Sequence, residues 1–126
     1  MVEEFAEIIE RCLKKGAIEE ELFDTLIEDM EIENDDDYLQ LLHFDIPAAL
    51  KELMDSAGLY YTLYHKKDDI DSHEYIASCE TESGRKIAVF FDVDIDFETG
   101  EAILVGVTAY ADRTLPKGLL PYYHPV

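Results

Sequence analysis

RKIAVFFDVDIDFETGEAILVGVTAYAD, residues 85–112, is the stretch that decides the fold. Apolar residues alternate with polar or small ones on both sides of the segment FETGE at 97–101. Such alternation is typical of strands with one buried face. Glu-Thr-Gly fits a three-residue hairpin loop that a glycine in the left-handed region closes. The stretch therefore predicts two antiparallel strands, at about 85–97 and 101–112.

The same pattern continues toward the N-terminus. A second turn of the same form, TESGR at 81–85, separates residues 73–81 from the predicted hairpin. The turns set a register that places Phe91 opposite Val107 on one side and opposite Tyr75 on the other. A slip by one residue would bring polar side chains onto the apolar face, so the register is strongly specified. We expect a four-stranded antiparallel meander at about 59–65, 73–81, 85–97 and 101–112.

The first half of the chain has apolar residues at helical spacing. Gly16 is expected to end the first helix, and Pro47 fits only the first turn of the last one. The pattern predicts helices at about 2–15, 17–31, 36–43 and 46–57. Packed on the apolar face of the meander, they give an α+β domain.

We expect one domain over residues 1–113 and a tail over 114–126. The tail, TLPKGLLPYYHPV, has three prolines in its last eleven residues. Proline cannot donate to a strand ladder, so this tail is not expected to extend the sheet by regular pairing. It is either docked on an apolar surface or disordered.

The charge is strongly acidic: 30 Asp and Glu against 10 Lys and Arg, a net charge of −20. Such a surface repels nucleic acid and anionic membranes, and it attracts cations and basic proteins. Adaptation to high salt gives the same composition. Cys12 and Cys79 fit no metal-ligand spacing and are interpreted as buried thiols in a reducing compartment. With no signal peptide or apolar run of spanning length, we expect a cytoplasmic protein.

The predicted register also defines the face opposite the core. Glu74 lies opposite Asp92 there, and like charges facing one another are destabilising. Lys86 is expected to pair with Glu80 and Asp112, which leaves the other end uncompensated. Aromatic anchors with a charged surround are typical of protein interfaces. The candidate partner-binding residues are Tyr60, Tyr64, Glu74, Ile76, Phe90, Asp92, Asp94, Asp96, Leu104 and Tyr110.

These residues favour a small interaction protein that binds and neutralises a basic partner. A nuclease toxin or a nucleic-acid-binding protein is such a partner, and the chain would then be an immunity protein, an antitoxin or a nucleic-acid mimic. The first alternative is a metal-dependent or carboxylate enzyme that uses Glu74, Asp92 and Asp94. The second is a homodimer through the same face with no catalytic role. An enzyme is the minority interpretation, because no known catalytic motif occurs.

The metal hypotheses rest on ligand type alone. DVDIDFETGEAI, residues 92–103, begins like an EF-hand loop, but Phe97 and Ile103 stand where Gly and Glu are required. Glu74 with Asp92 suits Mg²⁺ or Mn²⁺, and His65 opposite His73 suits Zn²⁺. No cofactor is expected beyond a divalent cation at these positions.

Overall fold

A computed structural model describes residues 2–29, 31–66, 73–96, 98–113 and 119–121. The helical elements are α1 (Val2–Lys15), α2 (Asp35–Gln40), a π-helical turn (Leu41–Asp45) and α3 (Ile46–Ser56). The strands are β1 (Ala17–Asp29), β2 (Tyr60–Lys66), β3 (His73–Glu80), β4 (Lys86–Asp96), β5 (Glu101–Ala111) and β6 (Leu119–Pro121).

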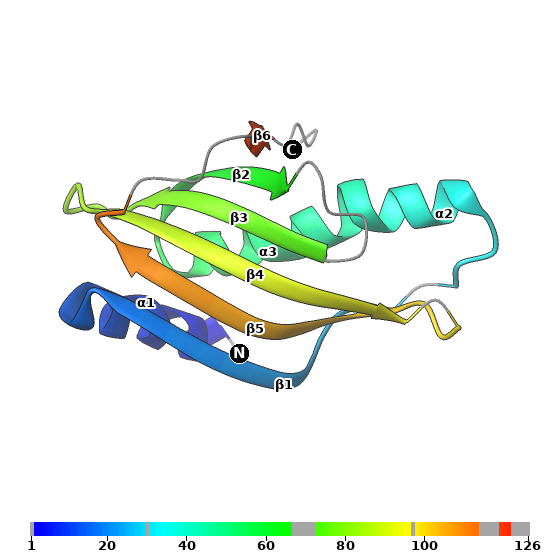
Figure 1. Cartoon of the computed structure of the whole chain (residues 1–126), viewed down its shortest axis with the longest axis horizontal. Coiled ribbons are helices and arrows are strands. Elements are labelled where there is room, and N and C mark those ends of the chain that lie inside the picture. Colours follow the sequence, from blue (N-terminus) through cyan, green and yellow to red (C-terminus); the bar gives the residue numbers. More distant parts are fainter. Residues whose placement is uncertain (1, 30, 67–72, 97, 114–118, 122–126) are drawn as a thin grey trace.

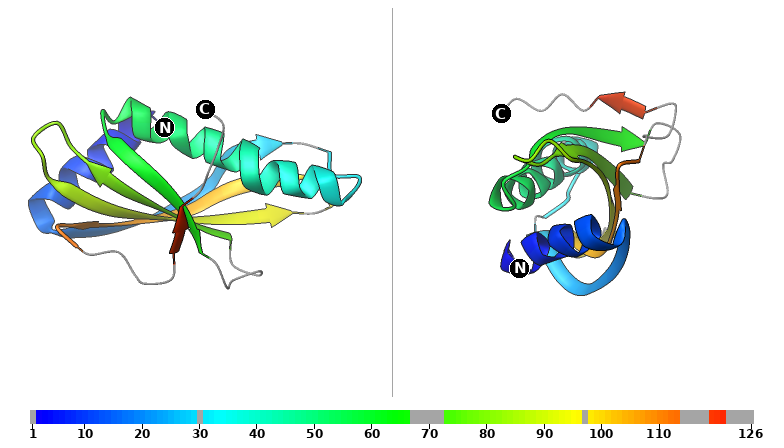
Figure 2. Two further views of the ribbon diagram at one scale, coloured as in Figure 1. Left: turned by 90° about the horizontal axis from the view of Figure 1, so that it is seen from above. Right: turned by 90° about the vertical axis from the view of Figure 1, so that its left-hand side faces the viewer.

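The strands form one six-stranded antiparallel sheet in the order β1-β5-β4-β3-β2-β6. The sheet curves, and both α1 and the α2–α3 segment lie on its concave side (Figures 1 and 2). Apolar side chains from these helices and the concave face of the sheet form the core. The fold is therefore α+β with two layers, as predicted.

The predicted meander is confirmed as the centre of the sheet. Phe91 pairs with Tyr75 on β3 and with Val107 on β5, and the three residues are at most 1% exposed. The loop between β3 and β4 has the predicted length, because the Thr81 N–H donates to the Arg85 carbonyl at 2.9 Å. Two other predicted registers were wrong.

The first error is at the turn between β4 and β5. Asp96, and not Phe97, lies opposite Glu101, so the loop has one more residue than predicted. The Asp96 carboxylate accepts the backbone N–H groups of Glu98 and Thr99 at 2.9 and 3.3 Å, which stabilises the longer loop. A bulge between Asp92 and Val93 in the ladder then restores the predicted register.

The second error is a shift of two residues between β2 and β3. His65 pairs with Tyr75, and Leu63 pairs with Ala77. A shift of two keeps each side chain on its face, so the apolar pattern alone could not detect it. His73 pairs with Val93, and the two histidines are therefore not cross-strand partners.

The predicted helix at 17–31 is wrong, since residues 17–29 form the edge strand β1 against β5. Register shifts between Glu21 and Thr25, and between Leu26 and Glu28, interrupt the alternation of a regular strand. The bulges leave apolar residues at intervals that imitate a helix. Pairing with β5 outweighs the local helix propensity of a Glu- and Leu-rich segment.

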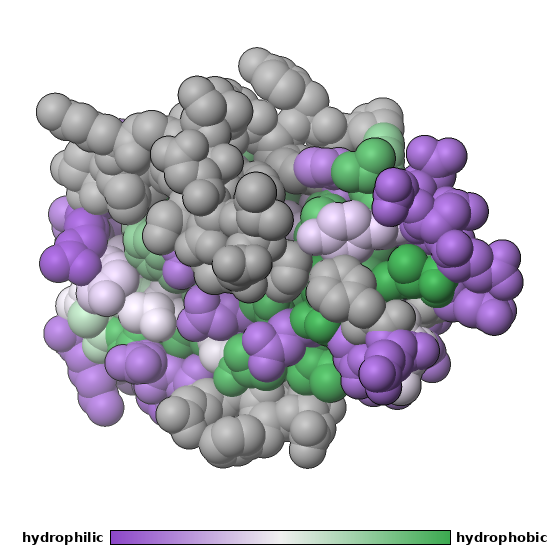
Figure 3. Space-filling view, turned by 45° about the vertical axis from the view of Figure 1, so that its right-hand side comes forward, coloured by the Kyte–Doolittle hydropathy of each residue, from purple (hydrophilic) through white to green (hydrophobic). Residues whose placement is uncertain are grey.

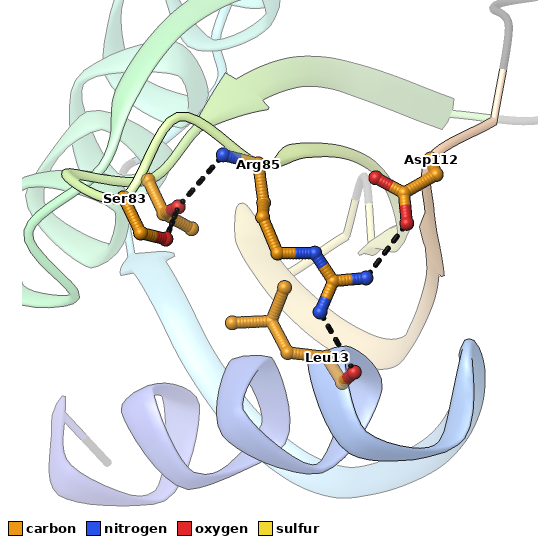
Figure 4. A network of polar contacts seen from close by, with 5 residues as sticks. Leu13, Ser83, Arg85 and Asp112 are labelled. Carbon is orange, nitrogen blue, oxygen red and sulfur yellow. Dashed lines mark hydrogen bonds and ion pairs between the residues drawn. The ribbon is translucent and has the colours of Figure 1, made fainter.

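Helix α1 has the predicted bounds and buries Phe5, Ile8, Ile9 and Cys12. Gly16 ends it with a φ of +86°, a conformation that favours glycine, and its N–H donates to the Cys12 carbonyl. The Arg85 guanidinium donates to the Leu13 carbonyl at 3.1 Å and to Asp112 at 2.6 Å (Figure 4). This contact fastens the end of α1 to the sheet.

The two predicted helices at 36–43 and 46–57 are one helical segment joined by the π turn. Asn34 caps its start by accepting the Asp37 N–H. Asp45 has helical torsions and makes no side-chain cap. The Ile46 N–H donates to the Leu41 carbonyl, but Pro47 has no N–H with which to continue the series. The buried Tyr75 hydroxyl donates to the Leu42 carbonyl at 2.7 Å.

Three residues of the predicted tail, Leu119–Pro121, pair with β2 as β6. This corrects the expectation that the tail makes no strand pairing, and proline is tolerated here because the strand lies at an edge. The rest of the tail, 114–118 and 122–126, lies outside the described residues. No helix in the described part of the chain is both long and apolar enough to cross a membrane.

Candidate functional site

The convex face of the sheet, opposite the helices, has an apolar centre. Ile76 of β3 pairs with Phe90 of β4, and Ala88 pairs with Tyr110 of β5. Ile76 and Ala88 are each only 1% exposed, although they lie outside the main core cluster. The Phe90 and Tyr110 rings meet edge to face, with centroids 5.7 Å apart. The Arg113 guanidinium lies 4.0 Å from the Tyr110 ring centroid.

The acidic end of this face continues from that centre along β4. Glu74 and Asp92 are cross-strand partners, as predicted, and Gly106 flanks Asp92 on β5. A Cβ atom at Gly106 would lie 3.6 Å from Oδ2 of Asp92 and 3.5 Å from the Glu20 carbonyl oxygen. Asp94 follows on the same face and is exposed. We call Glu19, Glu74, Asp92 and Asp94 the acidic cluster.

Asp92 has a raised pKa. Loss of water around the carboxyl group is the largest cause, although Asp92 is exposed. A hydrogen bond with Glu74 lowers the Asp92 pKa, while the charges of Asp94 and Glu19 raise it. The net shift is upward, because the loss of water and the two neighbouring charges outweigh the hydrogen bond.

No Lys or Arg among the described side chains forms an ion pair with Asp92, Asp94 or Glu19. The ion pairs between described side chains are Arg11–Glu20, Lys51–Asp55 at 2.8 Å and Arg85–Asp112 at 2.6 Å. The prediction for Lys86 was wrong, because Arg85 pairs with Asp112 in its place. Lys86 does lie opposite Glu80 in the ladder.

Two predicted partner-binding residues have structural roles. Leu104 is 0% exposed and belongs to the core. The bulge in β5 moves Leu104 opposite Val93 and puts Ile103 opposite Asp94 on the convex face. Asp96 is on the predicted face, but its carboxylate holds the loop after β4.

The candidates on β2 keep the predicted face, but the shift of two residues changes their partners. Tyr64 pairs with Ile76 on the convex face, and Tyr60 is 71% exposed at the start of β2. Figure 3 shows hydrophobic side chains of the described part of the molecule bordered by hydrophilic ones. Sequence reasoning missed Glu19, which lies beside Thr108, because the segment that carries it was taken for a helix.

The described residues contain no group of three or more His, Cys, Asp and Glu side chains placed to hold a metal ion. The side chains of His65 and His73, the predicted zinc pair, lie outside the described residues. Cys12 and Cys79 are both buried, and burial raises both thiol pKa values. A buried thiol with a raised pKa is a poor nucleophile.

The chain matches no known protein-family model, no curated protein and no solved structure.

Proposed function

We propose that the chain is an acidic interaction protein that binds and neutralises a basic protein through the convex face of its sheet. The observation that carries the proposal is the acidic cluster beside an apolar, aromatic centre, with no basic side chain paired to Asp92 or Asp94 among the described residues. Like charges that face one another cost stability unless a cation or a basic partner compensates them.

The chemistry of the face indicates the chemistry of the partner. Phe90, Tyr110 and the exposed Tyr60 offer aromatic surface to an apolar or guanidinium group. The acidic cluster offers carboxylates to Lys and Arg. The net charge of −20 would steer a basic partner toward the chain and make association fast at low salt. Nuclease toxins and nucleic-acid-binding proteins have such surfaces, so an immunity protein, an antitoxin or a nucleic-acid mimic is the proposed class.

The test is affinity capture of basic proteins from the source cells, followed by measurement of binding with the purified partner. Asp92→Lys with Asp94→Lys should reduce the affinity by at least tenfold at low salt. The matched control is Glu31→Lys with Glu33→Lys, which makes the same charge change in exposed residues between β1 and α2. It should weaken binding far less.

Three results would count against the proposal. The first is that no basic partner is captured, and the second is equal loss in the two double variants, which would show that only the total charge matters. The third is that light scattering detects a homodimer, and that the double variant Asp92→Lys with Asp94→Lys is a monomer. That result would assign the convex face to self-association.

A further inference from the structure

A cavity opens on the helical side of the sheet, between α3 and the second half of β1. Apolar residues from three elements line it: Leu26, Ile27, Ala49, Leu50, Leu53 and Leu104. Among the described residues that line it, Glu52 of α3 is the one with a charge. The cavity lies on the face opposite the acidic cluster.

A bulge in β1 shapes one wall of this cavity. Leu26 pairs with Ile103 and Glu28 with Ala102, so Ile27 is left out of the ladder between them. An extra residue of this kind bends a strand and redirects its side chains, and such bulges are common beside binding sites. Ile27 packs against the core from this position.

The cavity is large enough for a small organic molecule. Its volume is about 250 Å³. An apolar cavity of about 150 Å³ in a protein interior binds benzene, and one water takes about 30 Å³ in the liquid. Water makes few hydrogen bonds in a site with six apolar lining residues. A hydrocarbon group makes van der Waals contacts there, and its apolar surface is removed from solvent.

Charge selects among hydrocarbon ligands. Glu52 is exposed and forms no ion pair or hydrogen bond with the described residues. The neighbouring cation, Nζ of Lys51, is held by Asp55 at 2.8 Å. With a net charge of −20 on the chain, this cavity mouth favours a cation and disfavours a carboxylate.

We propose that the cavity binds a small amphipathic cation, an ammonium group on an apolar chain or ring of about six carbons, a size set by the benzene comparison. The hydrocarbon contacts Leu26, Ile27 and Ala49, the lining residues that are not fully buried, and the ammonium group lies beside Glu52. This site is independent of the proposed partner-binding face, because the two lie on opposite sides of the sheet.

Methyl NMR with the full chain at low salt tests the site directly. The probes are n-hexylammonium, 1-hexanol and hexanoate, which share a six-carbon chain and differ in charge. Hexylammonium should shift the methyl signals of Leu26, Ile27 and Ala49 and give nuclear Overhauser effects to them. Hexanol should bind about two- to fivefold more weakly, the range for an exposed ion pair. Hexanoate should not bind.

Variants separate the pocket from the overall charge. Glu52→Gln should reduce hexylammonium affinity to the level of hexanol, and the matched change Glu10→Gln on the exposed side of α1 should leave it unaltered. Ala49→Leu should fill the cavity and abolish binding of both ligands. If Ala49→Leu does not fold, the Overhauser effects in the parent chain still decide the location. Three results would each overturn the proposal. The first is that the Overhauser effects come from residues outside the cavity, and the second is that hexanol and hexylammonium bind with equal affinity. The third is that Glu52→Gln and Glu10→Gln reduce the hexylammonium affinity equally.

Discussion

Asp92 illustrates at the scale of one residue how a candidate binding site lowers stability. Its carboxyl group faces Glu74 and lies near the charges of Asp94 and Glu19, and its pKa is raised in the folded chain. A raised pKa means that the folded state holds the proton more tightly than the unfolded state. Stability from this group is therefore full below the unfolded pKa and is lost as the pH rises through the folded pKa.

The first prediction follows from the raised pKa of Asp92, which means that its negative charge destabilises the folded chain. Asp92→Asn should increase the free energy of unfolding at pH 7 by about 0.2–1 kcal/mol, the range for cross-strand charge pairs, with a smaller gain at pH 4. Urea unfolding of both proteins at the two pH values measures it. Asp112→Asn, which removes the ion pair with Arg85, should have the opposite sign. A loss of stability in Asp92→Asn at pH 7 would contradict the interpretation.

The second prediction concerns the two thiols. Burial raises the pKa of Cys79 to about 12, and its Sγ lies 3.5 Å from Sδ of Met54. Burial also raises the pKa of Cys12. Neither thiol should react with a thiol-specific reagent in the native chain at pH 8, and both should react after unfolding in urea. Rapid labelling of either cysteine in the native state would show that its element opens readily.

At the scale of the element, the π turn between α2 and α3 depends on a contact from the sheet. The Tyr75 hydroxyl donates to the Leu42 carbonyl just before Pro47. Tyr75→Phe should lower the free energy of unfolding by about 0.5–1.5 kcal/mol, because it removes a buried hydrogen bond. Tyr60→Phe is the control, since Tyr60 is 71% exposed and the change should stay within about 0.5 kcal/mol. Equal effects in chemical denaturation would contradict a structural role for the Tyr75 hydroxyl.

The elements also show which parts of the fold the sequence could predict. Apolar residues alternate along most of β4, so its faces and the pair Glu74–Asp92 were predictable. β1 was not, because two bulges remove its alternation and its pairing with β5 depends on residues about 80 positions away. Bulges and unrecognised pairing also limited the prediction of the residues on the convex face. The bulge that buries Leu104 has no clear sequence signal, and Glu19 was recognisable only once β1 was known.

At the scale of the whole molecule, the excess of negative charge works against the compact state. With a net charge of −20, the folded chain concentrates repulsion that salt screens over about 10 Å at 0.1 M. We expect the urea midpoint at pH 7 to rise between 0.02 and 0.5 M KCl, with an unchanged dependence of the unfolding free energy on urea. An unchanged or lower midpoint would show that local ion pairs such as Arg85–Asp112 outweigh the overall repulsion.

The pairing of β1 with β5 also has a consequence for biosynthesis. Asp29 pairs with Glu101, and these closest partners are separated by 72 positions (101 minus 29). At roughly 5–20 residues per second, the ribosome delivers the partner strand about 4–14 s after β1 has been made. Until β5 has been synthesised, β1 has no strand partner on that edge, and unpaired strand edges promote aggregation. Its sequence, AIEEELFDTLIED, has six acids and no base, so nascent chains on neighbouring ribosomes would repel one another at this segment until β5 emerges.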